Sequence, residues 1–424
     1  MSVSVLARWS RRWLLLEPGE ARTFVLAFGY FFALIGSYML LRPVRETLAV
    51  RAGETEWLFS SVFVIMLLIL PLFGWLVSTF PKRIFLPASY AFFILNLCAF
   101  GYWLEHDPES LWAGRVFFVW LSVYNMFVVS LFWSLMVDVF RPDAARRLFG
   151  PIAAGGSLGG LVGPLISILN VDSLGTGGLV LTAAAMLVVA LCCQLLLLRS
   201  VDRDARGKAP IGGSIWAGAR SLLQNRYLLG LALVLVFMPL ANTMLYFIQR
   251  DMVGAAFATD AARLKWFGLV DFGTQALALI LQFFVTSRLL RRIGPSWTLV
   301  IMPVLTVVGF AALAAAPGIV VLGVFQALRR GGEYGLMKPA RELLYTPVSQ
   351  EAKYKTKNFI DTAVYRGGDM GSGWLYRALS DGFAVGLVGI ASLGALAAAV
   401  WTGVAWRAGR SFEVLTKERE QTTP

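Results

Sequence analysis

Long apolar stretches recur along almost the whole chain, and they limit how it can fold more than any other feature. Twelve of them begin near Phe24, Phe59, Ile84, Trp112, Gly150, Gly177, Tyr227, Lys265, Trp297, Gly318, Asn358 and Gly382. The 424 residues give each stretch about 35, enough for a bilayer-spanning helix of ~20 residues and a short connection. No polar block of the ~50 residues that a soluble domain needs interrupts them. We therefore predict an all-α polytopic membrane protein with twelve transmembrane helices.

The composition excludes several kinds of chemistry. Only 15% of the residues are charged and 58% are hydrophobic, against ~25% charged in a soluble domain. The single histidine, His106, cannot build a histidine-rich metal site or a conventional catalytic triad. Cys98, Cys192 and Cys193 lie in apolar runs without metal-ligand spacing. There is no Gly-x4-Gly-Lys-Ser/Thr loop for ATP. We expect no enzyme activity, metal or cofactor, and an energy source in a gradient or an exchanged solute.

The positive charge of the chain, +13 in total, is unevenly distributed. If the N-terminus is cytoplasmic, 29 of the 38 lysines and arginines fall on the cytoplasmic side, as the positive-inside rule requires. We predict a bacterial inner (plasma) membrane location with both termini cytoplasmic, and no nucleic-acid partner. The early apolar patch Trp13 to Leu16 stops at Glu17 and Pro18, so we expect no cleavable signal peptide.

The chain is predicted to consist of two halves. We assign residues 1–23 to a cytoplasmic segment with an interfacial helix, 24–199 and 227–407 to two six-helix halves, 200–226 to a cytoplasmic linker, and 408–424 to a cytoplasmic tail. The basic turn Pro81-Lys82-Arg83 recurs as Arg288 to Arg292, and the charged connection 138–147 recurs as 338–357. A 6+6 pseudo-repeat with matching loops is the pattern of the major facilitator architecture.

Charged residues in membrane spans are costly and mark a pathway or a partner. At the end of the first span, Arg42 and Glu46 lie four residues apart on one helical face, with Arg45 beside them. This group is either an anion-attracting mouth or an interfacial ion pair.

The fourth span carries Asn125 and ends in Asp138, which lies within reach of Arg141 and Arg146 across the next turn. We expect the Asp138 group to be a cytoplasmic gate or a structural ion pair rather than a substrate ligand.

The second half carries more polar residues inside its spans. They are Asn242, Tyr246 and Gln249 on the seventh span, Asp271 on the eighth, Arg329, Arg330 and Glu333 on the tenth, and Lys357, Asp361, Arg366 and Asp369 on the eleventh. We expect Glu333 to pair with Arg329 or Arg330, and Lys357 with Asp361. Asp271 would pair with a basic residue or take up a proton. Cations are in excess along this path, which favours an anionic substrate, because arginine suits phosphate and carboxylate.

Glycines recur at four-residue spacing in two places: Gly155, Gly159 and Gly163 in the fifth span, with Gly156 and Gly160 beside them, and Gly367 and Gly371 in the eleventh. They follow no strand, so a phosphate loop is disfavoured. We expect close helix packing through small residues in both places.

Three stretches resemble the ATP/ADP translocase-type nucleotide transporters of plastids and intracellular bacteria. Residues 41–48, Leu-Arg-Pro-Val-Arg-Glu-Thr-Leu, resemble that family's Leu-Arg-Asp-Thr-Lys-Asp segment. Residues 132–150 resemble its stretch from Phe-Trp to Glu-Ala-Lys-Arg-Phe-Tyr. Residues 334–347 and 353–361 resemble its Tyr-Ser-Leu-Phe-Asp-Pro-x-Lys-Glu-Met-Ala-Tyr-Ile-Pro and Lys-x-Lys-Gly-Lys-x-x-Ile-Asp segments.

The resemblance implies a fold of the major facilitator type and exchange or proton-coupled transport of nucleotides or related phosphates. By position, Arg45 and Arg341 take the places of two basic residues of that family. The family has acidic residues in helices four and seven, whereas 122–125 and 246–249 contain no carboxylate here. The resemblance therefore carries over the fold but not ATP/ADP exchange in particular.

Our hypothesis is a monomeric transporter that moves an organic anion, such as a nucleotide, through a central cavity by alternating access. The predicted substrate-binding residues are Arg42, Arg45, Asn125, Asn242, Tyr246, Gln249, Asp271, Arg329, Arg330 and Arg341. The predicted coupling or gating residues are Glu46, Asp138, Arg146, Glu333, Lys357, Asp361, Arg366 and Asp369. Two alternatives stay open: an exporter of a siderophore, peptide or drug, and a membrane sensor or assembly partner that moves no solute.

Overall fold

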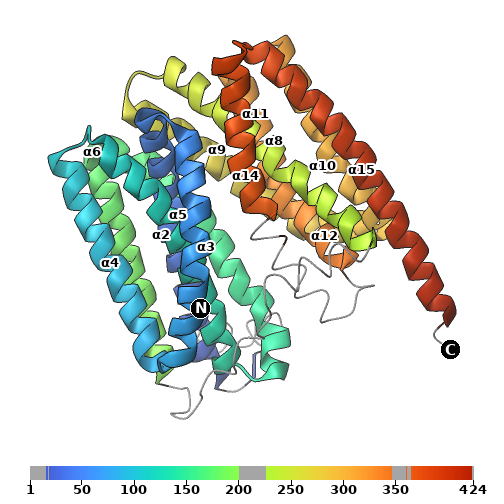
Figure 1. Ribbon diagram of the computed structural model, residues 1–424. Helices are drawn as coiled ribbons and strands as arrows, with labels where there is room; N and C mark the ends of the chain where they lie inside the picture. Colours follow the sequence, from blue (N-terminus) through green and yellow to red (C-terminus); the bar gives the residue numbers. More distant parts are fainter. Residues whose placement is uncertain (1–15, 18, 200–225, 346–359, 361–363, 423–424) are drawn as a thin grey trace, which may run out of the picture. The chain divides into compact units, whose positions relative to one another are not determined.

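The computed structural model describes residues 16–17, 19–199, 226–345, 360 and 364–422. Almost all of these residues are helical, and none of them lies in a strand (Figure 1). The prediction of an all-α chain is confirmed.

Twelve α-helices are described. In chain order they are α2 (Glu20–Ala52), α3 (Thr55–Thr79), α4 (Lys82–His106), α5 (Leu111–Val139), α6 (Pro142–Leu198), α8 (Arg226–Ala256), α9 (Asp260–Ile280), α10 (Ser287–Ala315), α11 (Ile319–Gly332), α12 (Lys338–Leu344), α14 (Tyr365–Arg377) and α15 (Leu387–Thr422). Three π-helical segments continue α9, α11 and α14, namely η1 (Leu281–Thr286), η2 (Glu333–Met337) and η4 (Ala378–Gly382). Ser110 caps α5 by accepting a hydrogen bond from the Ala113 amide, and Pro142 opens α6, as is usual at helix starts.

Two continuous helical stretches are each too long to be a single membrane span: α6, and the 56 residues 260–315 formed by α9, η1 and α10. The 57 residues of α6 would measure about 85 Å as one helix, far more than the ~30 Å hydrocarbon layer. Gly175, with φ of 62°, interrupts it, and Gly294, with φ of 77°, interrupts α10 in the same way. Glycine tolerates this left-handed backbone because it has no Cβ. Each break separates two spans, so the eight apolar helical stretches of the described residues provide ten spans. Residues 319–344 and 364–382 accommodate the other two of the twelve expected spans.

The chain forms two compact units that do not coincide with its sequence halves. Unit 1 consists of residues 1–52, 68–210 and 259–272, and unit 2 of residues 53–67, 211–258 and 273–424. The start of α3 therefore belongs to unit 2, and the first part of α9 belongs to unit 1.

In unit 1, α2 packs closely along α6. The glycines of α6 permit this, because a Cβ on Gly155 would lie 2.6 Å from the Phe28 carbonyl oxygen, and one on Gly163 would lie 2.5 Å from that of Gly36. The sequence prediction of close packing through this glycine row is correct.

In unit 2, α8 packs against α14 and α15, and α10 runs beside α15 (Figure 1). The predicted glycine contact of the eleventh span is wrong in its details. Among the described residues, a Cβ on Gly371 would meet no atom within 4 Å and one on Gly367 only a Phe63 ring atom at 3.9 Å. The close approaches are at neighbouring glycines instead, since a Cβ on Gly368 would lie 2.6 Å from Pro239.

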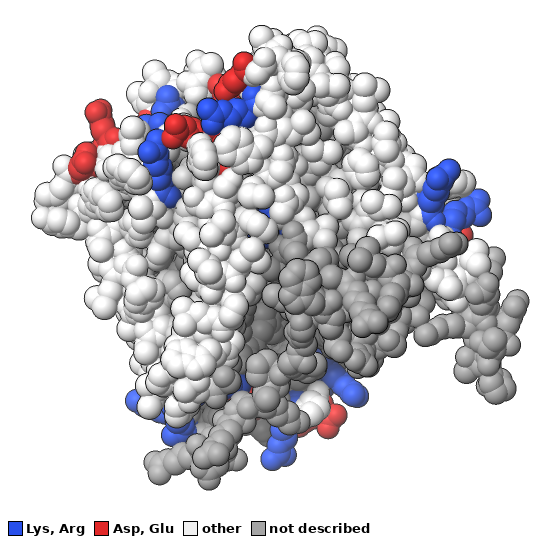
Figure 2. Space-filling view, in the orientation of Figure 1, with Lys and Arg blue, Asp and Glu red and all other residues white. Residues whose placement is uncertain are grey.

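Large apolar side chains cover much of the outside of both units. Leu68 and Leu95 are each 69% exposed, and Val320 is 73% exposed. Figure 2 shows wide stretches of this surface without charged side chains. A water-soluble protein exposes few such contiguous areas, whereas a lipid-facing surface consists of them.

Candidate functional site

A buried ion pair joins α2 to the middle of α9 within unit 1. Nη1 of Arg42 lies 3.7 Å from Oδ1 of Asp271, and the two side chains are only 15% and 3% exposed. The sequence predicted that Asp271 would pair with a basic residue or take up a proton, and the structure places Arg42 beside it. An arginine and a carboxylate buried together are tolerable in an apolar setting because each compensates the charge of the other.

The neighbouring Arg45 contacts two groups in unit 1. It forms an ion pair with Glu46, whose side chain is 6% exposed, and its guanidinium lies 4.9 Å from the centre of the Phe118 ring. Glu46 therefore pairs with its chain neighbour, whereas the sequence spacing had suggested Arg42. Arg42 and Arg45 both lie at the end of α2 where the chain approaches α5 and α9.

Unit 2 contains a second buried arginine with a carboxylate partner. Arg329 of α11 lies 3.7 Å from Glu333 of η2, with the side chains 5% and 13% exposed. This is one of the two pairings that the sequence predicted. Arg330 and Arg341 are half-buried, on α11 and α12. Arg329 is a buried residue in the last turn of α11, the helix that corresponds to the predicted tenth span.

A cluster of hydrogen bonds links α8 to α14 in unit 2. Asn242 donates to the Tyr365 hydroxyl at 2.8 Å, and Thr243 donates to Oδ1 of Asp369 at 3.1 Å. Asp369 is 8% exposed, and its other oxygen lies 3.7 Å from Arg366. The predicted coupling residues Arg366 and Asp369 are therefore in contact.

The other predicted substrate ligands lie on the same helices as these clusters. Gln249 is 4% exposed on α8, and Tyr246 packs edge-on against Phe59 at 5.3 Å between ring centres. Asn125 is half-buried on α5 in unit 1.

The predicted partners of Asp138 need correction. Asp138 pairs with Lys82 of α4 at 2.5 Å, where the sequence had suggested Arg141 and Arg146. Lys82 follows the short turn before α4, and that turn brings it beside the end of α5. The predicted pair of Lys357 and Asp361 lies outside the described residues.

Two further polar contacts were not predicted from the sequence. Glu56, at the start of α3, is 5% exposed and forms an ion pair with Arg377 of α14 in unit 2. In unit 1, Tyr30 donates to Tyr90 at 2.6 Å and accepts from Gln194 at 2.9 Å. The only sequence signal was a glutamate and a glutamine within apolar runs, and neither indicates a partner far along the chain.

Comparison with known proteins decides what kind of molecule carries these clusters. The model of the Major Facilitator Superfamily matches residues 23–340. The chain belongs to this superfamily. It is therefore a membrane transporter, with the fold expected from its repeated loops.

Among individual proteins, ADP,ATP carrier protein 1 of Chlamydia trachomatis is 22% identical over 434 residues, which cover 85% of this chain and 82% of that protein. ADP,ATP carrier protein 2 of Chlamydia pneumoniae is also 22% identical, over 84% of this chain and 81% of that protein. The resemblance recognised from three short stretches thus extends over most of the chain.

Solved structures agree on the fold. A POT family transporter in complex with 5-aminolevulinic acid has a TM-score of 0.67 at 12% identity and covers 92% of this chain and 96% of that one. The nucleoside transporter NupG has a TM-score of 0.58 at 13% identity, over 95% and 100% of the two chains. A bacterial homologue of ferroportin in the inward-facing state has a TM-score of 0.65 at 14% identity, over 93% and 100%.

Proposed function

We propose that this major facilitator protein carries nucleotides or closely related phosphorylated anions across a bacterial inner membrane by alternating access. The observation that carries the proposal is the buried arginine–carboxylate pair in each unit, Arg42 with Asp271 and Arg329 with Glu333. The similarity to two chlamydial ADP,ATP carriers supports a nucleotide as the anion.

The geometry of these two pairs suits arginines that change partner. Both nitrogen-to-oxygen distances are 3.7 Å, longer than the ~2.7–2.9 Å of a charge-assisted hydrogen bond. By contrast, Arg147 binds Glu20 in unit 1 with two hydrogen bonds of 3.0 and 3.3 Å, as a permanent structural pair does. A phosphate group would offer Arg42 and Arg329 shorter contacts than their present carboxylates, so it can displace them.

The carboxylates keep the arginines tolerable when no anion is bound. An arginine without a counter-charge in an apolar environment is strongly unfavourable. In our proposal Asp271 and Glu333 neutralise the arginines before the anion arrives and after it leaves. Arg45, Arg330 and Arg341 supply the remaining positive charge, and we propose no catalytic step.

Asn242, Tyr246, Gln249 and Asn125 complete the proposed substrate site as neutral hydrogen-bonding groups. They suit the base or sugar of a nucleotide, which carries donors and acceptors but no charge. Glu46, Asp138, Arg146, Arg366 and Asp369 remain the proposed coupling or gating residues, together with Lys357 and Asp361.

We propose a monomer with both termini in the cytoplasm. The charge distribution supports this orientation, because most basic residues would face the cytoplasm. Transport proceeds either by exchange or by proton coupling, and the dependence of uptake on internal nucleotide or on an imposed pH gradient distinguishes the two.

The test is uptake of labelled nucleotides into proteoliposomes containing the purified protein. We expect Arg42→Ala and Arg329→Ala each to lower nucleotide uptake at least about tenfold, because a hydrogen bond to a charged group contributes ~1.5–3 kcal/mol. Arg410→Ala is the matched control, since Arg410 is exposed on α15 and its loss removes the same charge. Uptake of another solute with no nucleotide uptake would favour the exporter, and absence of any flux would favour the sensor.

A further inference from the structure

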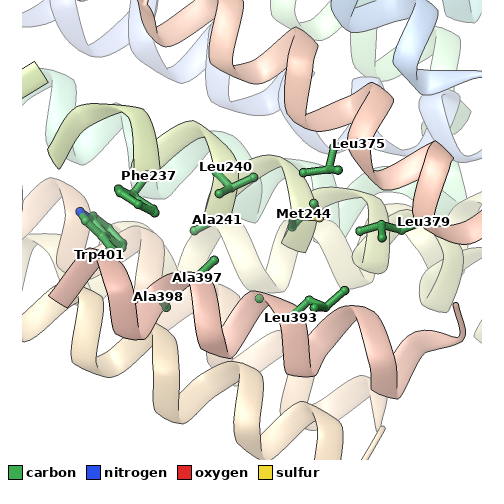
Figure 3. Close-up of a pocket in the computed structure, with 11 residues that line it drawn as sticks. Phe237, Leu240, Ala241, Met244, Leu375, Leu379, Leu393, Ala397, Ala398 and Trp401 are labelled. Atoms are coloured by element: carbon green, nitrogen blue, oxygen red, sulfur yellow. The ribbon is translucent and has the colours of Figure 1, made fainter. Parts of the chain in front are cut away.

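An apolar cavity lies within unit 2 between α8, α14 with η4, and α15 (Figure 3). Its volume is about 260 Å³. Phe237 and Met244 line it from α8, Leu375 from α14, Leu379 from η4, and Leu393 and Trp401 from α15. No charged residue is among those that line it, and none of the polar clusters described above opens into it.

The cavity adjoins a surface that faces lipid. Both α8 and α15 are apolar enough and long enough to cross a bilayer. Leu396 and Val400 are 65% and 58% exposed on α15, and Leu233 of α8 is 48% exposed. Leu375 and Leu393 line the cavity and are themselves 45% and 42% exposed, so its wall continues into the lipid-facing surface.

Trp401, at one end of the cavity, provides the only polar group that we assign to this site. Its side chain lies beside Phe237, at the opposite end from Leu379 (Figure 3). Trp401 is 3% exposed, and Nε1 is buried with no acceptor among the described residues. Buried tryptophan N–H groups normally have a hydrogen-bond partner.

We infer that this cavity is a binding site for one acyl chain of a membrane phospholipid, whose ester carbonyl accepts a hydrogen bond from Nε1 of Trp401. The volume supports a small occupant such as part of one acyl chain, because it lies just below the ~300–1,000 Å³ of pockets for compact small molecules. The lining supports an apolar body, and the unpartnered N–H supports a single acceptor at one end. The bilayer supplies phospholipid acyl chains at this position, because α8 and α15 are both long and apolar enough to cross it.

A bound acyl chain would lie between α14 and α15, so it would contact a helix that takes part in the proposed transport. Leu375 lies less than two helical turns from Asp369 on α14. A bound lipid therefore contacts the helix that carries the proposed coupling residue Asp369.

The test uses the fluorescence of the intact protein in lipid nanodiscs made with or without brominated phospholipid, because bromine quenches tryptophan on near contact. The contribution of Trp401 is the difference between wild type and Trp401→Phe. Trp406, which is 42% exposed on the same helix, provides the reference through Trp406→Phe. We expect quenching of Trp401 to reach at least half that of Trp406, although Trp401 is buried. Quenching of Trp406 without quenching of Trp401 would overturn the proposal.

Filling the cavity supplies the second arm. Ala397→Phe adds a ring inside the cavity, and we expect it to reduce Trp401 quenching severalfold. Ala399→Phe, on the exposed side of α15, is the matched control and should leave the quenching unchanged. Equal quenching in both variants would contradict the proposed lipid site. If Ala397→Phe fails to fold, the comparison of wild type with Trp401→Phe still tests whether lipid reaches Trp401.

Two comparisons between brominated lipids test which molecule occupies the cavity and how it is oriented. Phospholipid brominated close to the ester should quench Trp401 more than phospholipid brominated at the chain end, and the reverse order would refute the contact between the ester and Nε1. Quenching by brominated free fatty acid but not by phospholipid would refute the phospholipid as the source.

Discussion

The pair of Arg42 and Asp271 gives the sharpest prediction, because both its distance and its burial are defined. Asp271→Asn keeps the shape of the side chain but leaves the Arg42 guanidinium, 15% exposed, opposite a neutral amide. At 3.7 Å and an effective dielectric constant of ~20, the lost attraction is about 4.5 kcal/mol. Removal of one partner of a buried pair destabilises by a similar ~3–5 kcal/mol. Because Arg42 keeps some contact with solvent, we expect about 3 kcal/mol.

The assay is a double-mutant cycle of Arg42→Gln and Asp271→Asn, with the free energy of unfolding measured in detergent. Each single variant should be less stable than wild type, and the double variant should recover much of the loss, because the two opposite charges are then removed together. We expect a coupling energy of about 2–3 kcal/mol.

The matched control is the pair of Lys265 and Asp172 in the same unit, whose side chains are 40% and 64% exposed. Solvent screens this pair, so its coupling energy should stay below about 1 kcal/mol. If the coupling between Arg42 and Asp271 were no larger than that of the control pair, the view of a buried, mutually dependent pair would be refuted.

Two further predictions concern packing and the contacts of unit 2. Gly163→Ala should destabilise unit 1 by about 1–3 kcal/mol, because the new Cβ meets backbone atoms of α2 at 2.5 and 2.8 Å. Gly150→Ala, whose Cβ would meet nothing within 4 Å, should be neutral or stabilising, and equal melting temperatures for the two variants would disprove the packing argument. Glu56 and Asp381 both pair with Arg377, but only the Asp381 carboxylate is exposed, at 70%. Glu56→Gln should therefore lower the free energy of unfolding by about 2–3 kcal/mol. Asp381→Asn should change it by less than ~0.5 kcal/mol. Thermal unfolding of the two variants side by side checks this, and a larger loss for Asp381→Asn would contradict it.

The number and type of elements followed from the sequence because bilayer thickness fixes the length of an apolar helix. The boundaries were less certain, since hydropathy detects neither a helix that extends beyond the apolar stretch nor an apolar stretch that begins before its helix. The fifth span was expected near Gly150 but α6 begins at Pro142, and the twelfth was expected near Gly382 but α15 begins at Leu387.

Ion pairs within one helix were predictable, whereas pairs between helices were not. Arg329 with Glu333 and Arg366 with Asp369 follow from the spacing of neighbouring turns. The partner of Arg42 is Asp271, more than two hundred positions along the chain, and local spacing had indicated Glu46 instead. A charged residue in a span shows that a partner is needed but not which helix supplies it.

The glycine rows illustrate the same limit. The row in α6 lies against the backbone of α2, whereas among described residues Gly371 of α14 has no neighbour close enough to require a glycine. Spacing shows only that a helix could be approached closely. Whether another backbone approaches depends on the tertiary fold.

The central claim is that the buried arginines Arg42 and Arg329 bind a nucleotide during transport. The most direct measurement is exchange of labelled nucleotide into proteoliposomes preloaded with unlabelled nucleotide, for wild type, Arg42→Ala, Arg329→Ala and Arg410→Ala. We predict rapid exchange for wild type and Arg410→Ala, and exchange at least about tenfold slower for the other two. Absence of nucleotide exchange by the wild type, or undiminished exchange by Arg42→Ala and Arg329→Ala, would contradict the proposal.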